Sequence, residues 1–168
     1  MEHIPFEEII ARAYDSTGDV LYRIALSYMH SRHDAEDAVQ DAFARYIARG
    51  HGFSDPAEER AWLTRVTVNR CIDLLRRKNV RKLIHLDDIA ELSSADGSFE
   101  ESSQQELYDI LQRIPERNRA AVILHYLEGF SVEETAKMLG VSLSAAKMRL
   151  VRGREALREY YERSGDNV

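Results

Sequence analysis

One uninterrupted helical stretch, residues 55–82 (DPAEERAWLTRVTVNRCIDLLRRKNVRK), constrains the fold of this chain more than any other feature. Asp55 can cap the helix, Pro56 suits the first helical position, and Glu58 follows three residues after the cap. No proline or glycine interrupts the stretch afterwards. The sequence therefore predicts a single long helix around which the neighbouring segments pack.

The two sides of this helix differ in chemistry. At helical spacing, an apolar stripe predicts the side that faces a core: Leu63, Thr67, Val68, Cys71, Leu74 and Leu75. The opposite side is basic and also carries an indole: Trp62, Arg65, Val66, Asn69, Asp73, Arg76 and Arg77. From residue 60 to residue 82, eight basic residues oppose one acidic residue, in a chain whose net charge is −6. This pattern is typical of a nucleic-acid surface with a ring available for stacking. It also fits a solvated arginine face with the tryptophan packed under a neighbouring helix, and the helix alone does not decide between the two.

The rest of the chain has an all-α pattern. Three prolines, eight glycines and almost no alternation of apolar and polar residues leave little material for strands. Either a single helix or a helix pair divided at residues 16–18 is predicted over residues 5–29. A second helix is predicted over residues 34–49, with Ser31 as its cap and Gly50 at its end. Beside its apolar face lies an acidic and polar one, next to Phe43: Glu36, Asp37, Gln40 and Asp41.

The composition changes after residue 82. Residues 87–101 contain six acidic side chains and no lysine or arginine, and the run SSADGSFEESS has few apolar residues. Such a composition predicts a flexible acidic linker. We therefore expect two small helical domains, residues 1–83 and residues 104–168, joined by residues 84–103.

The last third of the chain is predicted to contain a helix-turn-helix. Ser103 and Glu106 form a capping box for a helix that ends at Pro115, and a second helix continues to Leu127, closed by Gly129. The helix-turn-helix spans residues 131–158, and five of its positions mark caps, crossing and turn: Ser131, Ala136, Gly140, Val141 and Ser142. Its second helix is basic, so it suits the major groove, with base edges near its start and phosphates further along. The alternative is an αα-hairpin in an ordinary bundle. Because the caps, the turn glycine and the basic charge occur together, DNA binding is favoured over this alternative.

Catalysis and metal binding have little support in the sequence. Glu36, Asp37 and Asp41, with His30 and His33 upstream, resemble a metal-ligand cluster, but no second carboxylate or histidine set accompanies them. A docking surface for a basic partner suits them better. The single cysteine, Cys71, lies in the apolar stripe and is expected to be a packed thiol, and no CxxC pair is present for zinc. The chain lacks a membrane-length apolar run and a signal-peptide layout, so we expect a cytoplasmic protein without a cofactor, not an enzyme.

Three segments in register resemble the extracytoplasmic-function (ECF) sigma factors of bacterial RNA polymerase. DAEDAVQDAF and AWLTRVTVNRCIDLLRR resemble parts of the family's region 2. The run LQRIPERNRAAVILHYLEGFSVEETAKMLGVS, continued by LVRGREALR, resembles region 4. The resemblance implies an alternative sigma factor that directs the polymerase core to promoters and helps to open the −10 region. Its implied partners are the core (β′ clamp helices and β flap), promoter DNA and an anti-sigma factor.

The resemblance also implies roles for individual residues. Docking on the polymerase would use Glu36, Asp37, Gln40 and Phe43. The −10 element would meet Trp62, Arg65, Asn69, Arg76 and Arg77, while the loop 51–55 would receive a flipped base. The −35 element would meet Lys147, Met148, Arg149, Val151 and Arg152. The chain departs from the family pattern at Met148, at residues 144–146 and at Gly153, which weakens a helix interior by roughly 1 kcal/mol relative to alanine.

Two other functions remain as alternatives to a sigma factor. One is a stand-alone dimeric helix-turn-helix regulator, in which residues 1–80 would form a dimerisation or effector domain. It would bind a palindrome without the polymerase. The other is a metal-dependent helical hydrolase, which would lose its activity on mutation of Glu36 or Asp41.

Overall fold

The computed structural model describes residues 3–29, 31–84 and 102–165, and within these ranges every regular element is helical. The all-α prediction is therefore confirmed for the described part of the chain. Tertiary contacts divide the chain into two compact units, Met1–Ala95 and Asp96–Val168. The predicted acidic linker lies almost wholly in residues 85–101, outside the described residues.

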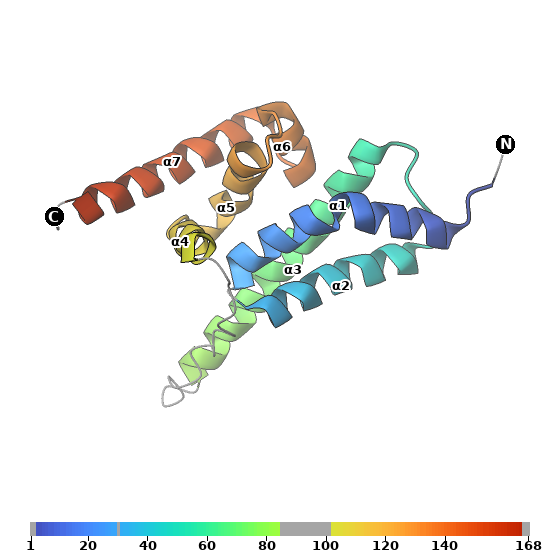
Figure 1. The fold of residues 1–168 in the computed structure, drawn as a ribbon, viewed down its shortest axis with the longest axis horizontal. Coiled ribbons are helices and arrows are strands. Elements are labelled where there is room, and N and C mark those ends of the chain that lie inside the picture. Colours follow the sequence, from blue (N-terminus) through green and yellow to red (C-terminus); the bar gives the residue numbers. More distant parts are fainter. Residues whose placement is uncertain (1–2, 30, 85–101, 166–168) are drawn as a thin grey trace. The chain divides into compact units, whose positions relative to one another are not determined.

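The first unit is built from three helices that pack against one another, α1 (Phe6–Met29), α2 (Arg32–Arg49) and α3 (Pro56–Ile84) (Figure 1). Long apolar side chains fill the space between them, and the rings of Tyr28 and Tyr46 are among the largest fully buried groups. α2 begins and ends as predicted. Ser31 accepts a hydrogen bond from the Asp34 backbone N–H at 3.3 Å, and Gly50 ends the helix with φ at 79°.

Of the two alternatives for the first segment, the single helix is correct and the division at residues 16–18 is wrong, because α1 continues through these residues. Thr17 and Gly18 are buried against the rest of the unit, so packing holds the helix where local propensity is weak. The hydroxyl of Ser16 donates to the Ala13 carbonyl oxygen at 3.3 Å, so it finds its acceptor within the helix.

α3 is the long helix that the sequence predicts, and Asp55 caps it by accepting from the Ala57 backbone N–H at 2.9 Å. Four residues of the predicted stripe are buried: Leu63, Thr67, Val68 and Cys71. The other two, Leu74 and Leu75, are only half-buried. The burial of α3 side chains therefore decreases towards its C-terminal end, where Leu83 is 74% exposed.

The second unit contains α4 (Ser102–Leu111), α5 (Glu116–Val122), the π-helical turn η2 (Ile123–Leu127), α6 (Val132–Leu139) and α7 (Leu143–Gly165). The helix predicted to end at Pro115 ends at Leu111, since Pro115 serves as the N-cap of α5. The side chain of Ser103, with its predicted capping box, lies outside the described part. Arg119 is buried and ties the α4–α5 connection by donating from Nη2 to the Ile114 carbonyl oxygen at 3.0 Å.

The helix-turn-helix has the predicted caps. Ser131 accepts from the Glu134 backbone N–H at 3.0 Å, and Ser142 accepts from that of Ala145 at 3.1 Å. Gly140 takes the left-handed conformation, with φ at 66°, and Ala136 is buried at the crossing of the two helices. Val141, which follows the turn glycine, is half-buried.

Candidate nucleic-acid interface

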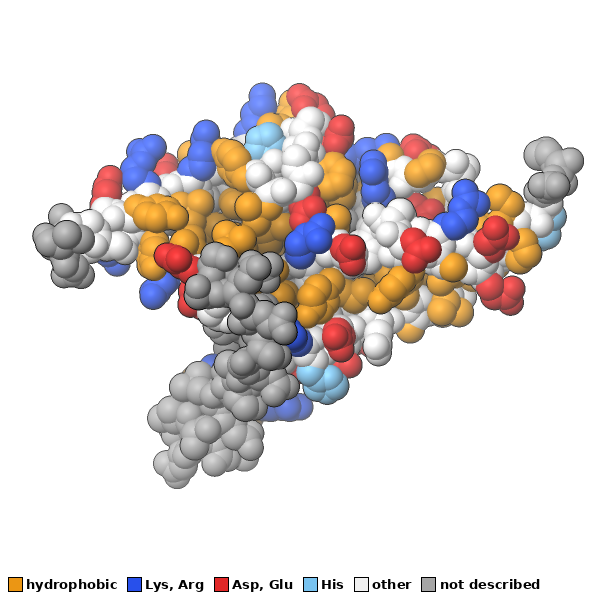
Figure 2. All heavy atoms as spheres, viewed as in Figure 1, with side chains coloured by type: hydrophobic (Ala, Val, Ile, Leu, Met, Phe, Trp, Pro, Cys, Tyr) orange, Lys and Arg blue, Asp and Glu red, His pale blue; other side chains and the backbone are white. Residues whose placement is uncertain are grey.

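The acidic face of α2 is open to solvent. Glu36, Asp37 and Gln40 are exposed, and Asp37 lies 3.6 Å from His33 on the preceding turn. Phe43, which the sequence places beside them, is 6% exposed because Tyr14 of α1 covers its ring, with 5.2 Å between the ring centroids. The structure thus brings three of the four predicted docking residues to one surface and puts the fourth beneath it. Figure 2 shows acidic and basic side chains interleaved over α1 and α2 on the visible face.

Trp62 lies in an aromatic cluster that the sequence did not indicate. Its ring is 5.7 Å from that of Tyr46 and 5.8 Å from that of Phe53, and the indole is half-buried. The guanidinium of Arg49 stands 3.8 Å above the Phe53 ring and completes the cluster. Phe53 belongs to the loop between α2 and α3, so the cluster fixes this loop against both helices. No spacing rule joins a loop residue to Trp62, which is why the sequence alone missed it.

Two groups at this cluster, the Tyr46 hydroxyl and the Glu59 carboxyl, have raised pKa values. Burial raises the pKa of Tyr46 to about 12, and the neighbouring Glu59 carboxylate adds to the shift. Burial likewise raises the pKa of Glu59. In each case removal from water disfavours the ionised form of the group.

The side chains on the basic side of α3 differ in their exposure and in their ion pairs. Asn69 and Arg76 are exposed, and Arg65 is half-buried. Arg77 is exposed but pairs with Asp73, with 3.3 Å between Nη2 and Oδ2. Since residues 62, 65, 69 and 76 recur at helical spacing, four of the five predicted −10 residues share one stripe on the side away from the buried one.

Two further cations of α3 reach across to α2. Arg70 Nε lies 2.6 Å from Asp41 Oδ2, and Arg70 Nη1 lies 3.2 Å from Asp73 Oδ2. Lys78 Nζ lies 2.8 Å from Asp34 Oδ2. These ion pairs were not predicted, because the partners are 29 and 44 residues apart in sequence.

Cys71 is a packed thiol, as predicted. Its side chain is fully buried, and burial raises its pKa from 9.0 to about 12. A thiol held protonated in this way is a poor nucleophile. In the described ranges, which leave out His30, no group of three or more histidine, cysteine or carboxylate side chains could hold a metal ion.

In the second unit, the predicted −35 residues lie on the first half of α7. Lys147, Met148 and Arg152 are exposed, whereas Arg149 and Val151 are half-buried. Residues four apart share a helix face, so Lys147 stands beside Val151 and Met148 beside Arg152. The second helix of the motif thus presents a mixed basic and apolar surface on its first half.

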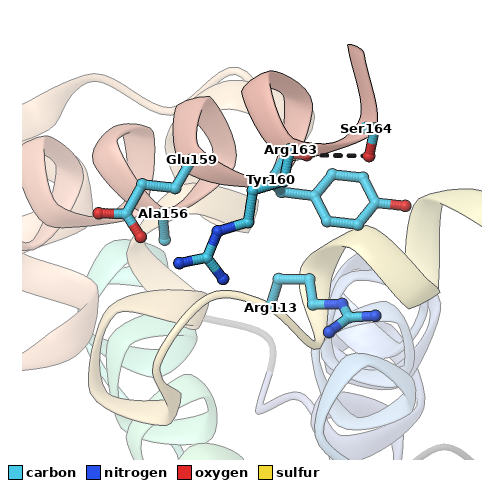
Figure 3. Close-up of a pocket in the computed structure, with 6 residues that line it drawn as sticks. All are labelled: Arg113, Ala156, Glu159, Tyr160, Arg163 and Ser164. Atoms are coloured by element: carbon cyan, nitrogen blue, oxygen red, sulfur yellow. Dashed lines mark hydrogen bonds between the residues drawn. The ribbon is translucent and has the colours of Figure 1, made fainter. Parts of the chain in front are cut away.

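A polar cavity of about 420 Å³ lies along the second half of α7, beyond this surface. Figure 3 shows Arg113 of the α4–α5 connection facing one stripe of α7 across it. The α7 residues that line it are Ala156, Glu159, Tyr160, Arg163 and Ser164. The Arg113 guanidinium lies 5.5 Å from the centre of the Tyr160 ring. No sequence feature marked this cavity.

Comparisons with known proteins agree in family and fold. Residues 13–81 match the family Sigma-70 region 2, and residues 104–157 match the family Sigma-70, region 4. The ECF RNA polymerase sigma factor SigM of Mycobacterium tuberculosis is 33% identical over 150 residues, which cover 88% of this chain and 76% of SigM.

Two solved structures resemble the fold. One contains the sigma factor RpoE in complex with the anti-sigma factor NepR from Bartonella quintana. Its TM-score is 0.71 at 25% identity, covering 90% of this chain and 96% of that one. The other contains CnrH in complex with the cytosolic domain of CnrY, with a TM-score of 0.66 at 24% identity, covering 93% and 89%. Within the described ranges, no helix is long and apolar enough to span a membrane.

Proposed function

The chain belongs to the ECF sigma factors of bacterial RNA polymerase, and from this premise we propose which of its surfaces carries each step of promoter recognition. As a sigma factor, it directs the polymerase to promoters and performs no catalysis itself. The proposal concerns the division of labour within the chain. Residues 1–83 dock on the core and open the −10 region, residues 104–168 bind the −35 element, and residues 84–103 connect the two.

Polymerase docking falls to the exposed acidic face of α2. Glu36, Asp37 and Gln40 offer acceptors to a basic or amide-rich partner surface, which on the polymerase is the β′ clamp helices. Phe43 contributes from beneath, since its contact with Tyr14 fixes the rotation of α2 against α1. The 3.6 Å separation of Asp37 from His33 is long for a hydrogen bond, so a cation or amide of the partner can replace this contact.

Promoter opening falls to the stripe on α3, and one observation carries this assignment. Arg65, Asn69 and Arg76 follow one another along the side of α3 opposite its buried face, and Trp62, half-buried against Tyr46 of α2, begins this stripe. A polar side chain that reads an unpaired base, flanked by cations for phosphates, is what single-stranded DNA requires. The Tyr46–Phe53–Trp62 cluster supports this role, because it holds the loop 51–55 ready beside the stripe. A base leaving the duplex would meet a pre-formed site.

Recognition of the −35 element falls to α7. Lys147, Met148 and Val151 stand where base edges are read, and Arg149 and Arg152 lie nearer to phosphates. We further propose that a partner of the anti-sigma class holds this chain, as NepR holds RpoE and CnrY holds CnrH. The cytoplasm, where the polymerase works, is the proposed site of action.

Reconstitution with core polymerase tests this function against the alternative of a stand-alone dimeric regulator. The account predicts that the chain copurifies with the core, binds duplex promoters weakly by itself, and yields a discrete run-off transcript only with the core. A stable homodimer that binds a palindrome tightly without the core, and that supports no transcript with it, would refute the assignment.

A further inference from the structure

Three carboxylates of the first unit pair with cations of the helix proposed to contact DNA. Asp34 and Asp41 of α2 pair with Lys78 and Arg70 of α3, and Asp73 of α3 pairs with Arg70 and with Arg77. Asp34 and Asp41 are seven residues, or two helical turns, apart on α2. Their partners Lys78 and Arg70 are eight residues apart on α3 and follow in the reverse order along the chain. The two contacts therefore form an ordered pair of bridges along the antiparallel crossing of α2 and α3.

These bridges add little to the stability of the fold. The side chains are partly exposed, at 22% for Arg70, 44% for Asp41, 47% for Lys78 and 33% for Asp34. Ion pairs at this exposure gain little in water and cost side-chain entropy. The buried apolar contacts between α2 and α3 hold the helices together without them, so another consequence of the pairing has to be sought.

That consequence concerns DNA. A lysine or arginine contributes to phosphate binding by releasing a condensed counterion from the duplex, and each such contact steepens the salt dependence of binding. A cation already neutralised by a carboxylate at 2.6 or 2.8 Å gives up that contribution unless the carboxylate lets it go. Arg70 and Lys78 are thus removed from the cations that α3 can offer, whereas Arg76 is exposed on the proposed stripe.

We propose that Asp34 and Asp41 are internal phosphate competitors, which mask Arg70 and Lys78 and so keep the free chain from binding duplex DNA non-specifically. The inference rests on the proposed function, because it takes α3 to be the DNA-contacting helix. The need for such a mask is physical. A genome offers a vast excess of non-specific sites, and a sigma factor that occupied them alone would be lost to the polymerase. A carboxylate on the neighbouring helix lowers this affinity without removing a cation from the sequence.

The test measures non-specific binding of the full chain to a duplex without promoter elements, as a function of salt. The variant Asp34→Asn with Asp41→Asn should bind more tightly at low salt. Its plot of log K against log salt should steepen by about 0.9 for each unmasked cation, approaching about 1.8 for both. The matched control is Asp15→Asn with Asp19→Asn, two exposed carboxylates on α1 that change the net charge equally. The control should leave the slope unaltered.

Two additions make the result decisive. Adding Arg70→Gln and Lys78→Gln to the Asp34/Asp41 variant should return the slope to its original value if these two cations make the new contacts. This variant has the net charge of the unaltered chain, so a general gain of positive charge is excluded by the α1 control. Circular dichroism melting of each variant monitors folding. If the double variant unfolds, Asp34→Asn alone, at the more exposed bridge, replaces it and should steepen the slope by about 0.9. Equal slopes for the Asp34/Asp41 variant and the α1 control would overturn the mask.

Failure of the mask is distinguishable from failure of the proposed DNA surface. In the otherwise unaltered chain, Arg76→Gln should flatten the slope by about 0.9 if α3 contacts DNA. A flattened slope for Arg76→Gln, combined with no effect of the Asp34/Asp41 variant, rejects the mask and leaves the surface in place. An unaltered slope for Arg76→Gln rejects the surface itself, and the mask with it.

Discussion

Gly153 of α7 lies directly against Val122 of α5, so closely that a β-carbon at position 153 would overlap Val122 Cγ2. The glycine that weakens the helix interior is therefore the residue that lets two helices of the second unit approach. This contact fixes α7, and with it the face of Lys147 and Met148, against the rest of the helix-turn-helix.

The contact between Gly153 and Val122 predicts that Gly153→Ala destabilises the chain, even though alanine favours a helix by about 1 kcal/mol. Overpacking of a tight core contact costs roughly 1–3 kcal/mol, so the net change should lower the melting temperature of the second unit. Gly165→Ala, on the same helix, should be neutral because a β-carbon added there would extend into open space. A melting temperature of Gly153→Ala at or above that of the unaltered chain would contradict the close packing. Val122→Ala combined with Gly153→Ala should recover part of the loss.

The thiol of Cys71 should resist modification in the native state. Burial raises its pKa from 9.0 to about 12, so the native thiol keeps its proton where an unfolded thiol has lost it. The stabilising contribution of the protonated thiol is complete below about pH 9 and is lost as the pH rises towards 12. At about pH 8, below both pKa values, a disulfide reagent should therefore react slowly with the native chain and rapidly in denaturant. Equal rates in the two conditions would show an accessible thiolate.

Asp37→Arg should abolish association with core polymerase while leaving the fold intact. The Asp37 side chain is 52% exposed and its nearest charged partner, His33, is 3.6 Å away, so reversal of its charge disturbs the docking surface rather than the core. Asp15→Arg, an equal charge change at an exposed position of α1, provides the control. Gel filtration with the core should show a complex for the control and none for Asp37→Arg. A normal complex for both would remove α2 from the docking role.

Lys147 and Arg152 should differ in how they affect −35 recognition. Lys147→Ala should change the preferred sequence, because a base contact discriminates by about 1–3 kcal/mol. Arg152→Ala should weaken binding to all sequences alike and flatten the salt dependence by about one unit. Selection of binding sites from a randomised −35 region, with the holoenzyme, separates the two effects. An unchanged sequence profile for Lys147→Ala would count against its role at base edges.

The parts of this molecule that local rules govern were predictable from its sequence. The Ser31, Ser131 and Ser142 caps, and the ends at Gly50 and Gly140, depend on residues within one helical turn. The all-α class, the long α3 and the helix-turn-helix follow from such signals together with apolar periodicity. Family membership needed more, namely three motifs in order and spacing.

What the sequence missed depends on partners that are distant along the chain. The weak residues 16–18 stay helical because other helices bury them, and Phe43 turns inward because Tyr14 covers it. The sequence left open whether Trp62 lies on the nucleic-acid side of its helix or packs under a neighbouring helix. In the structure it borders the basic stripe and also packs on Tyr46 and Phe53. The pairing of Arg70 with Asp41 subtracts charge from a helix whose sequence suggests a fully free basic face. Each of these outcomes requires the packed unit to be known.

Opening of the −10 region by the α3 stripe is the central claim, and Asn69→Ala tests it most directly. The Asn69 side chain is exposed, so the variant should fold and bind core polymerase normally. Asn79→Ala, at another exposed position of the same helix, is the matched control. The measurement is the fluorescence of a base analogue placed in the −10 element of a duplex promoter, which rises when the strands separate. We predict slower and less complete opening with the Asn69→Ala holoenzyme than with the Asn79→Ala holoenzyme, at equal occupancy of the core. Equal rates and amplitudes for the two would contradict the claim.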